Sequence, residues 1–202
     1  MVISAADVKK LRDMTGAGMM DAKKALTESD SDFDSAVKYL REKGLADSKK
    51  RADKEANQGT IGDYIHYQQD RAISGVLVEL ACETDFVAKS EEFKDAANQI
   101  AMHIAAMKPI YLNIENIPDA KLAEEKDIII KQSENEGKPA EVIDKIVEGR
   151  ITSFYKDTVL NEQIFCNPEI YEGKVSIMIE EMSGKLGEKI YIKQFSIVEV
   201  GS

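Results

Sequence analysis

The N-terminal quarter of the chain carries apolar residues at the spacing of amphipathic helices. A first helix is predicted to begin at Ser4, because Asp7, three residues later, completes a capping box. Two glycines, Gly16 and Gly18, then interrupt the pattern and permit a tight reversal of the backbone. Residues 19–26 resume the helical spacing, so the pattern predicts a helical hairpin.

A third helix is predicted to complete this region. Ser31 and Asp34 repeat the capping signature, and Gly44 predicts the end of the helix. Residues 48–59 form a charged run without large apolar side chains, which is typical of a linker, and we place the break near residues 50–58. The three helices together predict a small bundle whose core is marginal by itself.

After the linker, the apolar pattern changes from helical spacing to alternation. Residues 61–67 and 73–82 alternate and flank a polar turn, which predicts a β-hairpin. A segment at about 188–200, rich in Ile, Tyr, Phe and Val, predicts a third strand that joins this hairpin in an antiparallel sheet. We therefore divide the chain into a three-helix module with its linker, 1–54, and an α+β core, 55–202.

Further helices are predicted within this core. Apolar residues recur at helical spacing from Phe93 to Met107, up to a proline. An antiparallel helical hairpin is predicted at about 118–158, with its break at the Gly and Pro of residues 137–139. The segment 175–182 fits both a strand and a helix, and the Ser-Gly pair that follows it favours a helix.

Charge and composition narrow the class of partner. The 202 residues carry a net charge of −10, divided into +2 for residues 1–54 and −12 for the remainder, which favours a protein partner over nucleic acid. No apolar stretch approaches the roughly 20 residues that cross a bilayer, so no membrane role is expected. The N-terminus has no signal or transit-peptide character, so we expect a cytoplasmic location. Cys82 and Cys166 lie far apart, as reduced thiols do.

Local motifs give little support for catalysis or a bound cofactor. The run from Gly16 to Asp21 resembles the dinucleotide fingerprint, but a helix precedes it and Asp21 replaces the third glycine. The histidines and cysteines lack the spacing of a zinc site. Cys82 alternates with the apolar residues of its strand, so we expect it to point into the core and not to act as a nucleophile.

The two histidines have different surroundings in the sequence. His103 lies on the apolar face of a predicted helix, where a buried histidine with satisfied hydrogen bonds is the expected interpretation. His66 shares a strand face with Tyr64 near the end of the hairpin. Its imidazole could serve recognition or only the fold, and both interpretations stay open.

The tract at residues 82–89, CETDFVAK, joins an apolar strand to a helix. In its ordinary interpretation, Thr84 or Asp85 caps the helix and Phe86 covers the core. Glu83 and Asp85 could also suggest a magnesium site, but two carboxylates alone make a weak one. In a third interpretation, the scaffold projects Phe86 as an anchor at a protein interface. The sequence pattern by itself favours the first.

Two tracts stand out as motifs: residues 84–88, TDFVA, which follow an apolar strand, and residues 11–26, LRDMTGAGMMDAKKAL. The first resembles a signature of the bacterial elongation factor Ts family, and the second is similar to that family's N-terminal module. Two residues of this module depart from the family pattern. Met14 stands where other members often carry Arg or Lys, and Ala22 stands where they often carry Cys. Shorter matches follow in the same order, so the resemblance spans essentially the whole chain: 102–106, 137–139, 147–150 and 160–163.

This resemblance implies a guanine-nucleotide exchange factor for elongation factor Tu, a GTPase that carries aminoacyl-tRNA to the ribosome, with no cofactor and no enzymatic reaction of its own. It implies that Asp85 and Phe86 insert beside the partner's magnesium site and displace the ion, while Thr84 and Val87 shape the turn. Leu186 stands where Ile is common in the family. Further contacts with the partner are implied at Lys23, Arg51, His66, Leu186 and Gly187.

The length of the chain bears on its oligomeric state. Longer members of the family contain a duplicated core, whereas this chain has one hairpin, one helical pair and one closing strand. We therefore expect a symmetric homodimer that binds two partner molecules. Two other classes of function compete: an adaptor that binds proteins through ubiquitin-associated-like helices, and a small acid–base enzyme that uses Glu83 and Asp85.

Overall fold

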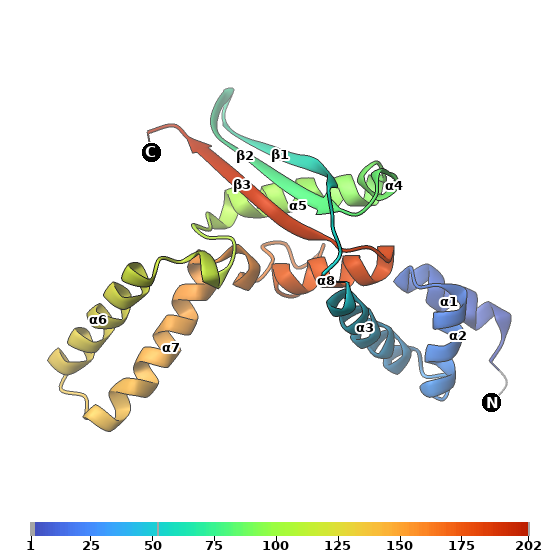
Figure 1. The fold of residues 1–202 in the computed structure, drawn as a ribbon, viewed down its shortest axis with the longest axis horizontal. Coiled ribbons are helices and arrows are strands. Elements are labelled where there is room, and N and C mark those ends of the chain that lie inside the picture. Colours follow the sequence, from blue (N-terminus) through green and yellow to red (C-terminus); the bar gives the residue numbers. More distant parts are fainter. Residues whose placement is uncertain (1–2, 52, 202) are drawn as a thin grey trace. The chain divides into compact units, whose positions relative to one another are not determined.

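The computed structural model describes residues 3–51 and 53–201, which form two compact units. The described residues of the first unit lie in the ranges 3–60, 80–93 and 177–191, and those of the second lie in 61–79, 94–176 and 192–201. The elements follow one another along the chain (Figure 1) as α1 (Ala5–Thr15), α2 (Met19–Glu28), α3 (Phe33–Lys50), β1 (Gln58–Gln68), β2 (Arg71–Cys82), α4 (Asp85–Ala88), α5 (Glu91–Met107), η1 (Ile114–Asn116), α6 (Asp119–Asn135), α7 (Ala140–Thr158), η2 (Leu160–Glu162), α8 (Val175–Leu186) and β3 (Tyr191–Glu199).

The N-terminal helices α1, α2 and α3 have an apolar core of their own. The predicted capping box is confirmed, since the Ser4 hydroxyl accepts from the Asp7 N–H at 3.1 Å and the Asp7 carboxylate accepts from the Ser4 N–H at 3.3 Å. Gly16 ends α1 with a φ of 68°, in the left-handed region that favours glycine. Six buried residues form the centre of the bundle: Val8, Leu11, Ala22, Ala25, Leu26 and Ala36.

The start of α3 differs from its prediction. Ser31 does not cap the helix, because α3 begins at Phe33 and Ser31 itself adopts a φ of 68°. Instead, the carboxylate of Asp32 accepts from the Ser35 N–H at 2.8 Å. The hydrogen bonds from Ser35 also lower the pKa of Asp32. The predicted Ser31–Asp34 cap is therefore wrong by one residue, because Asp32 is the better acceptor at the position that precedes the helix.

The predicted end of α3 at Gly44 is also wrong, since the helix continues to Lys50. A glycine inside a helix costs about 1 kcal/mol relative to alanine, so its presence calls for a compensating contact. That contact is the close approach of α3 to α8: a β-carbon built on Gly184 would lie 2.6 Å from the Cα of Gly44. The linker is accordingly shorter than predicted and occupies residues 51–57, of which Ala52 lies outside the described residues.

The sheet has the order β1-β2-β3, which confirms the predicted three-stranded antiparallel arrangement and the α+β class. Helix α5 runs along one face of the sheet (Figure 1). Val76 and Val78 on β2 and Ile100 and Ile104 on α5 are buried. Gly62 on β1 allows close contact, because a β-carbon there would lie 2.3 Å from the carbonyl carbon of Ala97.

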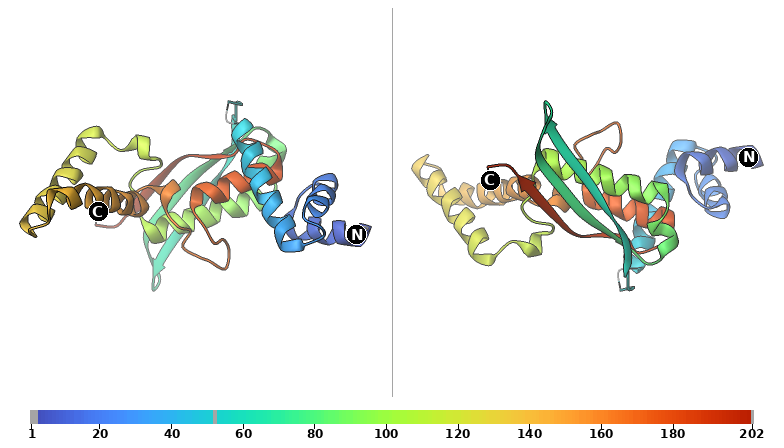
Figure 2. Two further views of the ribbon diagram at one scale, coloured as in Figure 1. Left: turned by 90° about the horizontal axis from the view of Figure 1, so that it is seen from below. Right: turned by 90° about the horizontal axis from the view of Figure 1, so that it is seen from above.

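Helices α6 and α7 form the predicted antiparallel hairpin and run side by side in all views (Figures 1 and 2). Pro118 precedes α6 and Pro139 precedes α7, where the missing N–H of proline costs nothing. Arg150 on α7 donates to the side-chain oxygen of Gln132 on α6 at 2.7 Å. The ambiguous segment at 175–182 is helical, as predicted, and belongs to α8.

His103 is a buried structural residue, as expected from its position on α5. Its Nδ1 accepts from the Cys166 N–H at 3.0 Å, so the neutral ring carries its proton on Nε2, which lies 3.0 Å from the Gln163 side-chain oxygen. Gln163 in turn donates to the Asp157 carbonyl at 2.9 Å. The ring stacks on Phe165, with 5.2 Å between the ring centroids. Burial lowers the pKa of His103.

Candidate functional site

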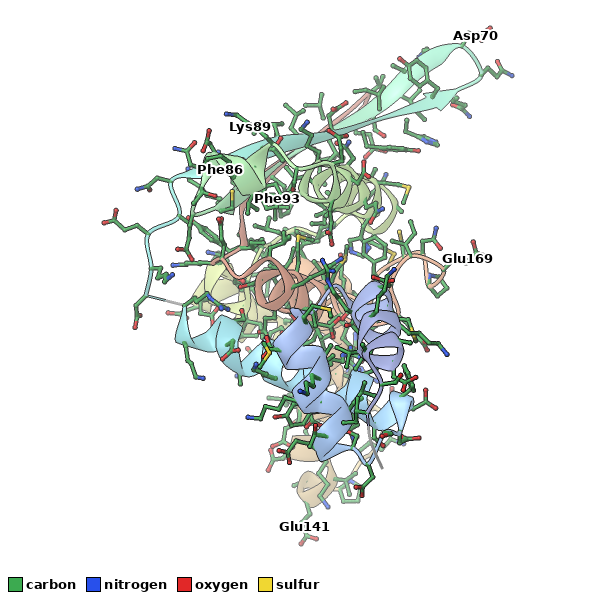
Figure 3. All side chains as sticks on the ribbon, turned by 90° about the vertical axis from the view of Figure 1, so that its right-hand side faces the viewer. Asp70, Phe86, Lys89, Phe93, Glu141 and Glu169 are labelled. Atoms are coloured by element: carbon green, nitrogen blue, oxygen red, sulfur yellow. The ribbon has the colours of Figure 1, made fainter. Side chains whose placement is uncertain are left out.

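The turn at residues 84–87, called here the contact turn, lies between β2 and α5 and forms most of the short helix α4. Thr84 is the N-cap of α4, and its hydroxyl accepts from the Val87 N–H at 3.4 Å. Phe86 is 83% exposed, so the interpretation in which this side chain covers the core is wrong. Figure 3 places Phe86 on α4, at the edge of its unit, whereas Phe93 at the start of α5 is fully buried.

Asp85 precedes Phe86 and presents a charged group beside it. The carboxylate is about half exposed and pairs with the ammonium of Lys89 at 2.6 Å, one helical turn later. The hydrogen bond from Lys89 lowers the pKa of Asp85, so the side chain is ionised at neutral pH. The contact turn therefore offers one large apolar group and one anionic group on adjacent residues.

Two glutamates, Glu83 and Glu188, hold the contact turn through hydrogen bonds and are called here the glutamate clasp. The carboxylate of Glu188 accepts from the N–H groups of Glu83 at 3.1 Å and Thr84 at 3.0 Å, and from the Thr84 hydroxyl at 2.5 Å. Glu83 makes the reciprocal bond, accepting from the Lys189 N–H at 2.6 Å, and also accepts from the Lys54 ammonium at 3.0 Å. The bond from Lys189 is the main reason that the pKa of Glu83 is lowered.

Cys82, the last residue of β2, is buried as predicted and supports the same turn. Its thiol donates to the Thr84 carbonyl at 3.2 Å. Burial, with a smaller contribution from the charge of Glu188, raises the pKa of Cys82 to about 11. The side chain is therefore a protonated hydrogen-bond donor, and its environment does not favour a thiolate nucleophile.

Most of the other predicted contact residues belong to the first unit. Leu186 is partly buried and Gly187 is exposed, and the clasp ties this segment to the contact turn. Arg51 is partly buried and lies near enough to Glu83 to help lower its pKa. Lys23 is exposed on α2. The structure therefore brings residues 84–87 and 186–187 together, with Arg51 near them.

His66 lies in the second unit, so the structure does not join it to the contact turn. It is exposed on β1 and, as predicted, shares a strand face with Tyr64. The two rings stack with 6.3 Å between centroids, and the Tyr64 hydroxyl lies 3.4 Å from Nδ1 of His66. His66 is therefore accessible to a partner, whereas Tyr64 is partly buried.

The structure also reveals candidate contact residues that the sequence pattern does not indicate. Met14, Met19 and Met20 flank the turn between α1 and α2 and are 60%, 46% and 78% exposed. Methionine side chains adapt to irregular apolar surfaces, so this group suits a protein interface. Glu188 is missed for a different reason, since no local signal connects it to residues more than 100 positions earlier.

Within the part of the chain that the structure describes, we find no metal site, no acid–base pair formed by Glu83 and Asp85, and no membrane-spanning helix. No group of three or more His, Cys, Asp or Glu side chains among these residues could hold a metal ion. Glu83 and Asp85 are instead committed to the separate contacts described above. No described helix is both long and apolar enough to span a bilayer.

Comparison with known proteins defines the class. The family model described as Elongation factor TS matches residues 3–201. The chain is 48% identical over 200 residues to elongation factor Ts of Moorella thermoacetica, covering 99% of this chain and 96% of the relative. It is 45% identical to elongation factor Ts of Herpetosiphon aurantiacus and of Fervidobacterium nodosum, each alignment covering 100% of both chains. The chain therefore belongs to the elongation factor Ts family, which implies nucleotide exchange on elongation factor Tu in translation.

Proposed function

We propose that this protein releases GDP from elongation factor Tu by inserting Asp85 and Phe86 beside the magnesium ion of that GTPase and displacing it. The observation that carries the proposal is the 83% exposure of Phe86 on a turn whose backbone is held by hydrogen bonds. A large aromatic side chain left in water loses the free energy of burial, about 1.5–3 kcal/mol, and regains it in a partner's pocket.

The proposed mechanism is electrostatic. Magnesium neutralises the phosphate oxygens of a bound nucleotide, so its displacement exposes the repulsion between those oxygens and weakens GDP binding. Binding linkage requires reciprocity: if the factor weakens GDP binding, GDP weakens factor binding by the same ratio. Binding of GTP then expels the factor and completes the exchange. The protein shifts a binding equilibrium and makes or breaks no covalent bond.

Further contacts with the GTPase are proposed on both units. In the first unit we assign this role to Lys23, Arg51, Leu186 and Gly187, supported by the exposure of Lys23 and Gly187. Lys23 lies on α2, which also carries the exposed Met19 and Met20, so a cationic and an apolar contact are available on one helix. In the second unit His66 is assigned the same role, supported by its exposure.

We also propose that the protein is a symmetric homodimer that binds two GTPase molecules. The sheet face opposite α5 supports this proposal, because it is lined by apolar residues from all three strands. Ile65, Leu77 and Val198 on this face are 44%, 54% and 71% exposed. Light scattering at micromolar concentration is expected to give the dimer mass. A monomer with full exchange activity would contradict the proposal.

The test of the proposed function is release of fluorescent GDP from elongation factor Tu, followed with and without this protein. Wild-type protein is expected to accelerate release, and Phe86→Ala to reduce the acceleration at least about tenfold, as truncation of an interface anchor does. Ile110→Ala is the matched control, because Ile110 is also apolar and 65% exposed but lies in the other unit. An undiminished rate with Phe86→Ala would remove this residue from the mechanism.

A further inference from the structure

We propose that Glu188 is a positioning residue for nucleotide exchange: its carboxylate fixes the backbone that aims Asp85 and Phe86 at the GTPase. This inference rests on the proposed function of the contact turn. In this proposal Glu188 does not contact the partner. Its side chain is partly buried and acts through its hydrogen bonds to residues 83 and 84.

The direction of Phe86 cannot be set by packing of its own side chain, which is 83% exposed. It must be set by the backbone that leads into the turn. Glu188 binds the N–H groups of Glu83 and Thr84, the two residues immediately before Asp85. It also accepts from the Thr84 hydroxyl, which accepts in turn from the Val87 N–H. Both hydrogen-bonding functions of that hydroxyl are thus occupied, and its rotamer is fixed.

Glu188 is itself anchored on the other side. Its carbonyl accepts from the Ser183 hydroxyl at 2.6 Å, and the N–H of Lys189 donates to Glu83 at 2.6 Å. Gly187, just before it, has a φ of 73°, which turns the chain between α8 and β3. The clasp therefore joins two segments about 100 residues apart, and movement of residues 186–187 is transmitted to the contact turn.

The chemistry of this position requires a carboxylate. Three donors converge on the two oxygens of Glu188, and hydrogen bonds to a charged acceptor are stronger than bonds to a neutral one. Glutamine keeps the size of the side chain but has one oxygen, and its amide group would face donors with another donor. Glu188→Gln should therefore release one side of the turn without leaving a cavity.

The first experiment measures GDP release from elongation factor Tu as a function of factor concentration. Glu188→Gln is expected to lower the maximal rate about fivefold, because small misplacement of a contact group is costly. The half-saturating concentration should change less, since the other contacts are intact. Glu180→Gln is the control: it removes the same charge from α8, and Glu180 makes no hydrogen bond or ion pair with the described residues. Its rate should stay within about 1.5-fold of wild type.

A double-variant cycle separates positioning from a direct contact. If Glu188 acts by aiming Asp85 and Phe86, adding Glu188→Gln to a variant that already carries Asp85→Ala and Phe86→Ala should change the rate by less than about twofold. Fully multiplicative effects would overturn the proposal, as would a wild-type maximal rate for Glu188→Gln. Thr84→Val, which removes one of the three donors, provides a milder variant if Glu188→Gln does not fold, and it should lower the maximal rate in the same direction.

Amide hydrogen exchange tests the clasp without the GTPase. The N–H groups of Glu83 and Thr84 should exchange with solvent faster in Glu188→Gln, while the amides of α5 keep their protection. Unchanged protection at both amides would overturn the proposal. If wild-type protein released no GDP, the proposed function would fail, and this measurement would still decide whether Glu188 holds the turn.

Discussion

Two polar networks tie loops to the body of this protein, and they differ in charge and in what they hold. The glutamate clasp uses two carboxylates, partly open to water, to hold a turn that projects an exposed Phe86. The network around His103 uses only neutral groups, centres on the fully buried side chains of His103 and Gln163, and holds the chain that follows η2. The first network holds a turn whose aromatic side chain stays exposed, whereas the second stabilises packing in the protein interior.

This contrast separates function from stability. A fully buried side chain stabilises the fold, so its removal lowers the free energy of unfolding. An exposed side chain on a rigid turn contributes little to folding stability, so its removal mainly weakens binding to a partner. Changes in the His103 network should therefore alter stability with little effect on exchange by the folded protein, and changes at the contact turn should do the reverse.

The largest expected effect is that of His103→Ala on stability. The variant leaves a cavity beside Phe165 and removes a partner from both Gln163 and the Cys166 N–H. Together these losses should lower the unfolding free energy by about 3 kcal/mol. Urea unfolding measures the change. A loss below about 1 kcal/mol would show that the buried network does not hold the fold.

The second prediction concerns the pH dependence of stability. Burial lowers the pKa of folded His103 below its ordinary value of 6.5, so its stabilising contribution is complete above that pH and is lost as pH falls. The pKa of Glu83 is lowered from its ordinary value of 4.5, mainly by the hydrogen bond from the Lys189 N–H, so this carboxylate stays ionised over the same pH range. Stability should fall between pH 6.5 and 5 by at most about 1.4 kcal/mol per pH unit. An equal slope in His103→Ala would contradict the assignment to His103.

The smallest predicted effect lies outside both networks, at Lys23. This exposed side chain contributes a charge to the proposed interface, and surface charges are worth less than about 1 kcal/mol. Lys23→Ala should raise the half-saturating concentration for exchange about threefold at low salt, with an unchanged maximal rate. Lys24→Ala is the control, because Lys24 is the neighbouring residue on α2 and is also exposed. Equal effects of the two variants would mean that only net charge matters.

Most elements could be predicted from the sequence because their signals are local. The capping box of Ser4 and Asp7 and the prolines before α6 and α7 each act within a few residues. The end of α3 could not be predicted in this way. Gly44 ends a helix by its intrinsic preference, but here it allows close approach to Gly184, and that contact is visible only in the folded structure.

The candidate site shows the same division. The pattern around Phe86 indicates a turn between a strand and a helix, yet pattern alone favours a buried aromatic, because most aromatic side chains are buried. Phe86 is instead 83% exposed, and the hydrogen bonds of Glu83 and Glu188 that hold the turn join residues more than 100 positions apart. The resemblance to the elongation factor Ts family predicts a partner contact at this turn, whereas Glu188 became visible only through its hydrogen bonds.

The most direct test of the central claim is the magnesium dependence of the effect of Phe86→Ala on GDP release from elongation factor Tu. If Phe86 acts by displacing magnesium, the variant should be at least about tenfold slower than wild type at millimolar magnesium. With magnesium removed by a chelator, GDP release is already fast and the two proteins should differ by less than about twofold. An equal deficit with and without magnesium would contradict the account.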